Sequence, residues 1–138
     1  MPLVKSLVAW LVILALAVAN GALREIVLIP VFGRATGLVL SGVSLSLLVA
    51  FVSFALVRLS HGITILQGLR VGASWLCLTL VFEFSFGRYV QHKSWSELLD
   101  AYTFKDGNIW PVVLLIILLA PSAAVLVQTR FQHASRGA

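Results

Sequence analysis

The residue of this sequence best suited to chemistry is Glu83, a carboxylate inside an otherwise apolar run. The run covers residues 72–89, GASWLCLTLVFEFSFGRY, and closes at Tyr89, a residue type common at membrane interfaces. Six residues of helix would place Glu83 roughly 9 Å inside that interface, at about 1.5 Å per residue. An ionised carboxylate within a membrane helix costs roughly 2.5–3.5 kcal/mol, so it needs a partner, a proton or water. Glu83 is therefore a structural carboxylate paired with a neighbouring helix, a site for a proton, cation or ligand, or a group exposed at the interface.

Further polar residues are expected at the same depth. In a four-span chain the first and third spans run in the same direction, so their C-terminal ends share one membrane face. Polar side chains stand near both of these ends, within a collar of Phe, Tyr and Trp residues. The candidate intramembrane polar cluster is Asn20, Arg24, Glu25, Thr79, Glu83 and Arg88. The plainer interpretation is a buried ion pair inside an ordinary aromatic belt.

Within this cluster we predict an ion pair between Glu83 and Arg24. Each residue is costly alone at membrane depth, and each offers the other a charge-assisted hydrogen bond. Glu25 is expected to point about 100° away from Arg24, because successive residues of a helix are rotated by that angle.

No catalytic, cofactor or metal site is expected. The sequence has no glycine-rich phosphate loop, no histidine pair at ligand spacing, and no Ser–His–acid set that the topology could bring together. The single cysteine, Cys77, lies in mid-span, which excludes a disulfide framework and a thiol relay. An integral-membrane enzyme usually needs at least two convergent acids or histidines, so we expect that the protein is not an enzyme.

Composition indicates which environment the chain needs. Of its 138 residues, 60% are hydrophobic and only 11% are charged, which a soluble domain of this length could not bury. The net charge of +5 is spread over termini and loops without a basic block. This pattern suits anionic lipid headgroups and disfavours nucleic acid as a partner. The expected partner is the lipid bilayer, with a homodimer or a larger membrane complex as a further possibility.

Four apolar segments, each long enough to span a membrane, carry the residues of the candidate polar cluster or connect them. We expect an all-α integral membrane protein whose four transmembrane helices form an antiparallel bundle, with a short interfacial amphipathic helix between spans 3 and 4. The chain is expected to be one membrane domain over 1–138, with spans at about 4–29, 36–58, 69–90 and 109–127 and the interfacial helix at 95–102. Pro121 should bend the last span, and the polar tail from Gln128 should be loose.

Three local patterns refine this picture. The run from Ser6 to Leu23 resembles a signal peptide, but apolar character resumes at 26–29, so we favour an uncleaved first span. Small residues four apart, such as Gly68 and Gly72, should let another helix approach closely. Ser94 begins a capping box that opens the interfacial helix.

Orientation is weakly specified. Five Lys or Arg residues fall on each side of a four-span chain, whereas all five acids fall on the side opposite the termini. Acids contribute little to orientation. We expect both termini to be cytoplasmic, and the even count of basic residues would also suit a dual-topology dimer.

The order of motifs resembles that of a known group of proteins. It comprises Asn20-Gly21-x-x-Arg24-Glu25, then WxxxTxxFEFxxG over residues 75–87, then tryptophan and tyrosine at 95 and 102. The chain resembles small bacterial four-span inner-membrane proteins to which no activity is attached, which implies a bacterial inner membrane and no mechanism. Weaker likenesses are to fluoride channels, whose phenylalanine- and threonine-rich pore motif is missing, and to small multidrug transporters, whose carboxylate is in the first span.

These observations predict a small inner-membrane protein with a structural or accessory role. The alternative is a small dimeric transporter or channel that uses Glu83 as its ion- or proton-coupling carboxylate.

Overall fold

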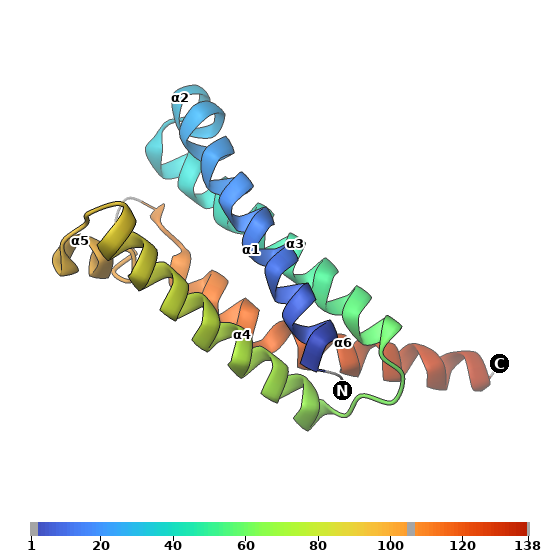
Figure 1. Cartoon of the computed structure of the whole chain (residues 1–138). Coiled ribbons are helices and arrows are strands. Elements are labelled where there is room, and N and C mark those ends of the chain that lie inside the picture. Colours follow the sequence, from blue (N-terminus) through green and yellow to red (C-terminus); the bar gives the residue numbers. More distant parts are fainter. Residues whose placement is uncertain (1–2, 105–106, 138) are drawn as a thin grey trace.

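The computed structural model describes residues 3–104 and 107–137, and in this part of the chain the protein is all-α (Figure 1). The first span is α1 (Leu3–Leu23), which continues through the π-helical turn η1 (Arg24–Leu28) into α2 (Ile29–Phe32). The second span is α3 (Arg34–Leu59), and the third is α4 (Ile65–Ser85) with the π-helical turn η2 (Phe86–Val90). A short helix, α5 (Trp95–Asp100), precedes the fourth span, α6 (Trp110–Arg136).

The four long helical segments pack antiparallel, and each is long and apolar enough to cross a membrane. Their mean hydropathy values are 2.2, 2.3, 1.5 and 2.5 in chain order, so the span that carries Glu83 is the least apolar. This confirms the predicted bundle of four spans with a short helix between the third and the fourth.

The ends of the helices depend on capping residues. Gly33 separates α2 from α3 with a φ of 89°, a backbone conformation that glycine adopts without strain. Thr64 and Gln67 form a reciprocal capping box at the start of α4, which begins four residues before the expected span. Ser94 accepts the backbone N–H of Glu97 and so caps α5, which is one half of the capping box predicted there.

The C-terminal tail corrects one expectation. Residues 128–136 were expected to be loose, but α6 runs without interruption through Pro121 to Arg136. The Gln128 side chain donates a hydrogen bond of 2.8 Å to the carbonyl oxygen of Phe54, which ties this part of α6 to α3. No glycine or proline interrupts the helix between Pro121 and Gly137, so it has no local reason to end earlier.

Close packing of α4 on α6 forms much of the core. A Cβ added at Gly72 would overlap the carbonyl oxygen of Leu118, and one at Gly68 would lie 3.0 Å from the backbone of Ser122. The predicted role of this small-residue pair is therefore confirmed. The largest fully buried side chains line the same region: Trp75, Ile117, Val49, Val113, Pro121 and Ser53.

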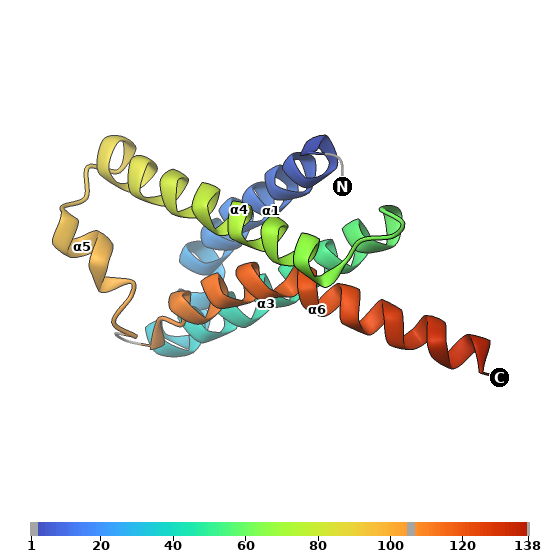
Figure 2. The ribbon, with the colours of Figure 1, turned by 90° about the horizontal axis from the view of Figure 1, so that it is seen from below.

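The bundle is tight at one end and spread at the other. In Figures 1 and 2, α4 diverges from α1 and α6 towards the end where α2 and α5 lie, whereas the start of α6 stays beside α3. We call this the open end, and we call the end with the chain termini and the connection 60–64 the closed end. Near the closed end, Trp75 Nε1 donates to the carbonyl oxygen of Ser6 at 3.1 Å, and Trp10 Nε1 donates to Thr79 Oγ1 at 3.1 Å. These two bonds join α1 to α4.

Candidate functional site

Glu83 lies in the last turn of α4 at the open end, where two aromatic donors hold it. Its Oε2 atom accepts a hydrogen bond of 2.9 Å from the Tyr102 hydroxyl and one of 2.8 Å from Trp110 Nε1. Tyr102 follows α5, and Trp110 begins α6. One carboxylate oxygen therefore ties the segment after α5 and the start of α6 to the third span.

The predicted ion pair between Glu83 and Arg24 is wrong. Arg24 Nε instead contacts Glu25 Oε1 at 3.2 Å, although Glu25 is its neighbour in sequence. The side chains are 33% and 61% exposed, so this ion pair is formed at the protein surface, outside the core. The flexible Arg24 side chain spans the angle between successive helical residues, whereas Glu83 satisfies its need for donors with uncharged groups.

The other members of the predicted cluster have partners of their own. Asn20 is buried and accepts a hydrogen bond from Ser41 on α3. Thr79 accepts the indole N–H of Trp10. Arg88 lies outside the cluster, because its guanidinium donates to the Lys93 carbonyl at 3.3 Å and sits 5.8 Å from the centre of the Trp95 ring.

A cavity of about 500 Å³ brings five of the six predicted residues together. It lies at the open end, where residues of α1, α3, α4, α5 and α6 line it, and Arg88 does not line it. Apolar side chains of all four spans line part of it, including Leu14, Leu45 and Val113. Phe82, Phe86 and Trp110 add aromatic surface, and the Phe82 and Phe86 rings stack at 5.4 Å.

The described acidic residues gather around the cavity, whereas most of the described basic residues lie elsewhere. Every carboxylate in the described part of the chain lines it, namely Glu25, Glu83, Glu97 and Asp100. The fifth acid, Asp106, lies outside the described residues. Of the nine basic residues in the described part of the chain, three line the same cavity: Arg24, Arg34 and Lys93. The cavity is thus the acidic region of a protein whose net charge is +5.

An aromatic stack fixes the segment after α5 against the third span. The Tyr102 ring lies parallel to Phe84 at 5.9 Å, and Trp95 lies 6.1 Å from the same Phe84 ring. Burial, together with the neighbouring Glu83 carboxylate, raises the pKa of the Tyr102 hydroxyl. Tyr102 therefore stays protonated at neutral pH and remains a hydrogen-bond donor.

Reasoning from sequence missed the functional pairing of Tyr102 and Trp110 with Glu83. Both residues belong to the aromatic collar that the sequence predicts around this level, and no acceptor was predicted for either of them. The available signal was their polar tips, since a half-buried indole N–H or phenol O–H needs an acceptor. Among the described residues, no group of three His, Cys, Asp or Glu side chains could hold a metal ion.

The fold and the cavity define a class: a small four-span helical membrane protein with a polar cavity at one end of the bundle. No model of a protein family, no curated protein and no solved structure matches the chain. The resemblance to a group of bacterial inner-membrane proteins therefore stays a prediction.

Proposed function

We propose that the protein is an accessory membrane protein, not an enzyme, that binds a partly apolar organic cation in the open-end cavity. One observation carries the proposal: all the described carboxylates of a basic protein line a single cavity with apolar and aromatic walls. The volume of about 500 Å³ falls within the range of roughly 300–1,000 Å³ typical of small-molecule sites.

The chemistry of the walls matches such a ligand. Aromatic faces attract cations through their ring quadrupole, by about 0.5–2 kcal/mol depending on desolvation. Glu97 and Asp100 lie on α5 beside the cavity, and neither side chain has an ion-pair partner among the described residues. Glu83 contributes a carboxylate deeper in the third span, and the apolar side chains of all four spans could contact the body of the ligand.

The second candidate function is a transporter or channel that couples to an ion or proton through Glu83. The geometry of the two Glu83 carboxylate oxygens favours this candidate. Oε2 accepts both aromatic donors, whereas Oε1 accepts no hydrogen bond from the described residues. Oε1 could therefore bind a proton or the cation itself, while Oε2 keeps its hydrogen bonds to Tyr102 and Trp110. In this candidate the protein works as a homodimer. In either case we propose a location in a bacterial inner membrane with cytoplasmic termini, so the open end faces away from the cytoplasm.

Paired probe ions test the proposal. Tetraphenylphosphonium and tetraphenylborate have similar shape and opposite charge, and their binding to purified protein in detergent can be measured by calorimetry against protein-free micelles. We expect saturable binding of the phosphonium alone. In E97Q/D100N, loss of two carboxylates near the site should weaken that binding about 5–10-fold, which corresponds to about 1–1.4 kcal/mol.

A matched control distinguishes the effect of charge near the cavity from the effect of the overall net charge. Gln132 and Ser135 are exposed on α6 near the C-terminus, so Q132K/S135K raises the net charge by the same two units far from the cavity. This variant should bind the phosphonium like the natural chain. Equal weakening in both variants, or equal binding of the two probe ions, would contradict the proposed site. Uptake of phosphonium into proteoliposomes, abolished by E83Q, would favour the transporter over the accessory role.

A further inference from the structure

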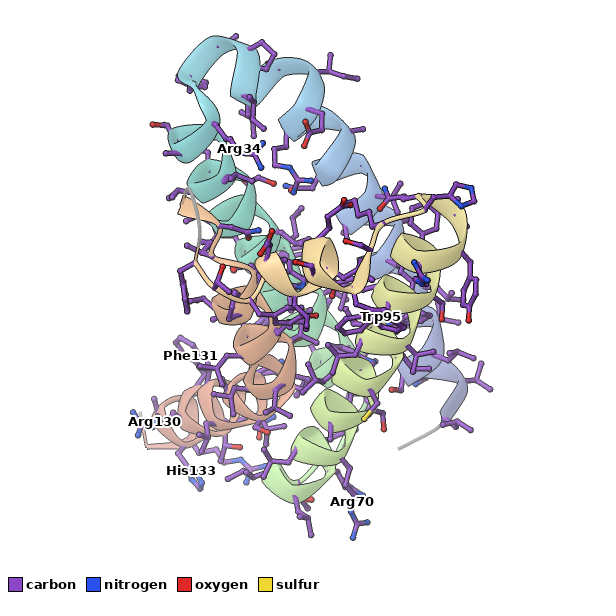
Figure 3. All side chains as sticks on the ribbon, turned by 90° about the vertical axis from the view of Figure 1, so that its left-hand side faces the viewer. Arg34, Arg70, Trp95, Arg130, Phe131 and His133 are labelled. Carbon is purple, nitrogen blue, oxygen red and sulfur yellow. The ribbon has the colours of Figure 1, made fainter. Side chains whose placement is uncertain are left out.

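The closed end differs from the open end in the sign of its charges. It carries five basic residues on α1, α3, α4 and α6, and no acid of the described chain lies there, because all of these line the open-end cavity. The basic residues are Lys5, Arg58, Arg70, Arg130 and Arg136, and all are exposed. Figure 3 shows Arg70 and Arg130 at one end of the molecule and Arg34 at the other.

A recess at this end offers suitable donors for a phosphate group. It has a volume of about 240 Å³ and lies between the starts of α1 and α4. Ser6, Gln67, Arg70 and Ser74 give it a polar lining, and the apolar side chains of Leu3 and Val71 complete it. The recess therefore combines donors for an anionic group with apolar surface.

Three polar side chains of the recess have donors available to a ligand. The Arg70 guanidinium and the Ser6 hydroxyl donate no hydrogen bond to any described residue, and Arg70 has no ion pair there. Gln67 uses its side-chain oxygen to cap α4, which leaves its NH₂ group as a donor. A guanidinium fork binds phosphate oxygens in a bidentate manner, which an isolated point charge does not.

The recess lies near the starts of two spans, α1 and α4, where lipid headgroups are expected. Arg70 follows the first residue of α4 by five positions, or about 7.5 Å of helix, within reach of the interface for a long side chain. The basic residues nearby raise the local concentration of anionic lipid, at about 1 kcal/mol per Lys or Arg close to an anionic surface.

We propose that the closed end binds the headgroup of an anionic phospholipid, with its phosphate between Arg70, Gln67 and Ser6. Apolar contacts with Leu3 and Val71 retain the glycerol backbone and the first part of an acyl chain. Lys5 precedes Ser6 on α1 and adds positive charge at the closed end, and its ammonium group donates a hydrogen bond of 3.2 Å to the Leu59 carbonyl oxygen at the end of α3. This site is independent of the proposed cation cavity, which is at the other end of the bundle.

The test compares two lipids that share acyl chains. Thermal unfolding of the full chain in detergent is measured with added dioleoyl phosphatidylglycerol or dioleoyl phosphatidylcholine, and native mass spectrometry counts bound lipid. We expect a higher unfolding temperature with phosphatidylglycerol, and a difference between the lipids that shrinks as salt is added. Equal stabilisation by both lipids would overturn the proposal, as would an equal shift from glycerol 1-phosphate alone.

Three single variants locate the site. Arg70, Arg130 and Arg88 are all exposed arginines, so R70Q, R130Q and R88Q make the same change in charge. R70Q should lose most of the phosphatidylglycerol-specific shift, whereas R130Q at the same end and R88Q at the open end should keep most of theirs. If R70Q and R130Q lost equal shares, diffuse surface charge would explain the effect, and the recess would not be a binding site.

Discussion

The closed and open ends of the bundle use the same kinds of residue in different ways. Near the closed end, tryptophan N–H groups of α1 and α4 bond across to the opposite helix, and Trp75 is fully buried. At the open end, Trp110 directs its N–H to the Glu83 carboxylate beside a cavity. In the first case the bonds join two spans directly, and in the second they hold a segment that borders a cavity.

The difference has a physical cause in the chain itself. Gly68 and Gly72 let the α4 backbone approach α6 closely, so van der Waals contact can stabilise this part in lipid. Towards the open end, Glu83 and several large aromatic residues replace such small residues on α4, and α4 separates from α6. Stability is therefore expected to reside in the tight part, and adaptability in the part with the cavity.

One of the two largest expected effects tests the tight part. Gly72→Ala should destabilise the protein by about 1–3 kcal/mol, because the added Cβ would overlap the Leu118 carbonyl oxygen and push α4 away from α6. Gly21→Ala is the control, since the nearest atom to its Cβ is 3.8 Å away in the Arg24 side chain. It should be neutral or stabilise by up to about 1 kcal/mol, as alanine usually does in a helix. Thermal unfolding in detergent measures both, and equal effects would contradict the description of the tight part.

Tryptophan substitutions compare the two ends directly. Trp75→Phe removes a buried bond to Ser6 and leaves space in the core, so we expect a loss of about 2–3 kcal/mol. Trp95→Phe on α5 changes a side chain that is 57% exposed, and its cost should stay within about 0.5 kcal/mol. Unfolding of each purified variant by heat, or by increasing amounts of a denaturing detergent, measures both losses of stability. A Trp95 variant as unstable as the Trp75 variant would show that the open end is packed as firmly as the closed end.

A double-mutant cycle tests the polar bonds of the open end. Glu83→Ala leaves the Tyr102 hydroxyl without its acceptor, so Glu83→Ala and Tyr102→Phe should be coupled by about 0.5–2 kcal/mol. The cycle of Glu83→Ala with Arg24→Gln should instead be additive, because Arg24 pairs with Glu25. Strong coupling in the second cycle would restore the ion pair that the structure excludes.

The smallest expected effect is a dependence on alkaline pH at the open end. The pKa of Tyr102 is raised in the folded protein, first by burial and then by Glu83, so the folded state keeps its proton more strongly than the unfolded state. This contribution to stability is fully present below the unfolded pKa of about 10 and is lost as pH rises through the folded value. Between pH 9 and 11, the stability to unfolding should therefore fall less in Tyr102→Phe than in the natural chain. Identical profiles would remove Tyr102 from this role.

Composition and local pattern were sufficient to predict the class of fold. Four long apolar segments in 138 residues indicate helices that span a bilayer. Inside a bilayer the backbone N–H and C=O groups have no water to bond, so each segment must form its hydrogen bonds internally, as a helix does. Local rules also predicted the cap at Ser94 and the close approach at Gly68 and Gly72. Depth alone indicated that Glu83 needs a partner.

The identity of that partner was decided by tertiary structure. Tyr102 and Trp110 lie 19 and 27 residues from Glu83, and they reach it only because the connection between α4 and α6 folds back over the open end. The same folding gathers Glu97 and Asp100 around the cavity, although nothing in their spacing indicates a shared site. Spacing along one helix determines which residues share a face, whereas contacts between helices depend on how far the spans diverge. That divergence follows from the packing of all four spans together, which no single segment encodes.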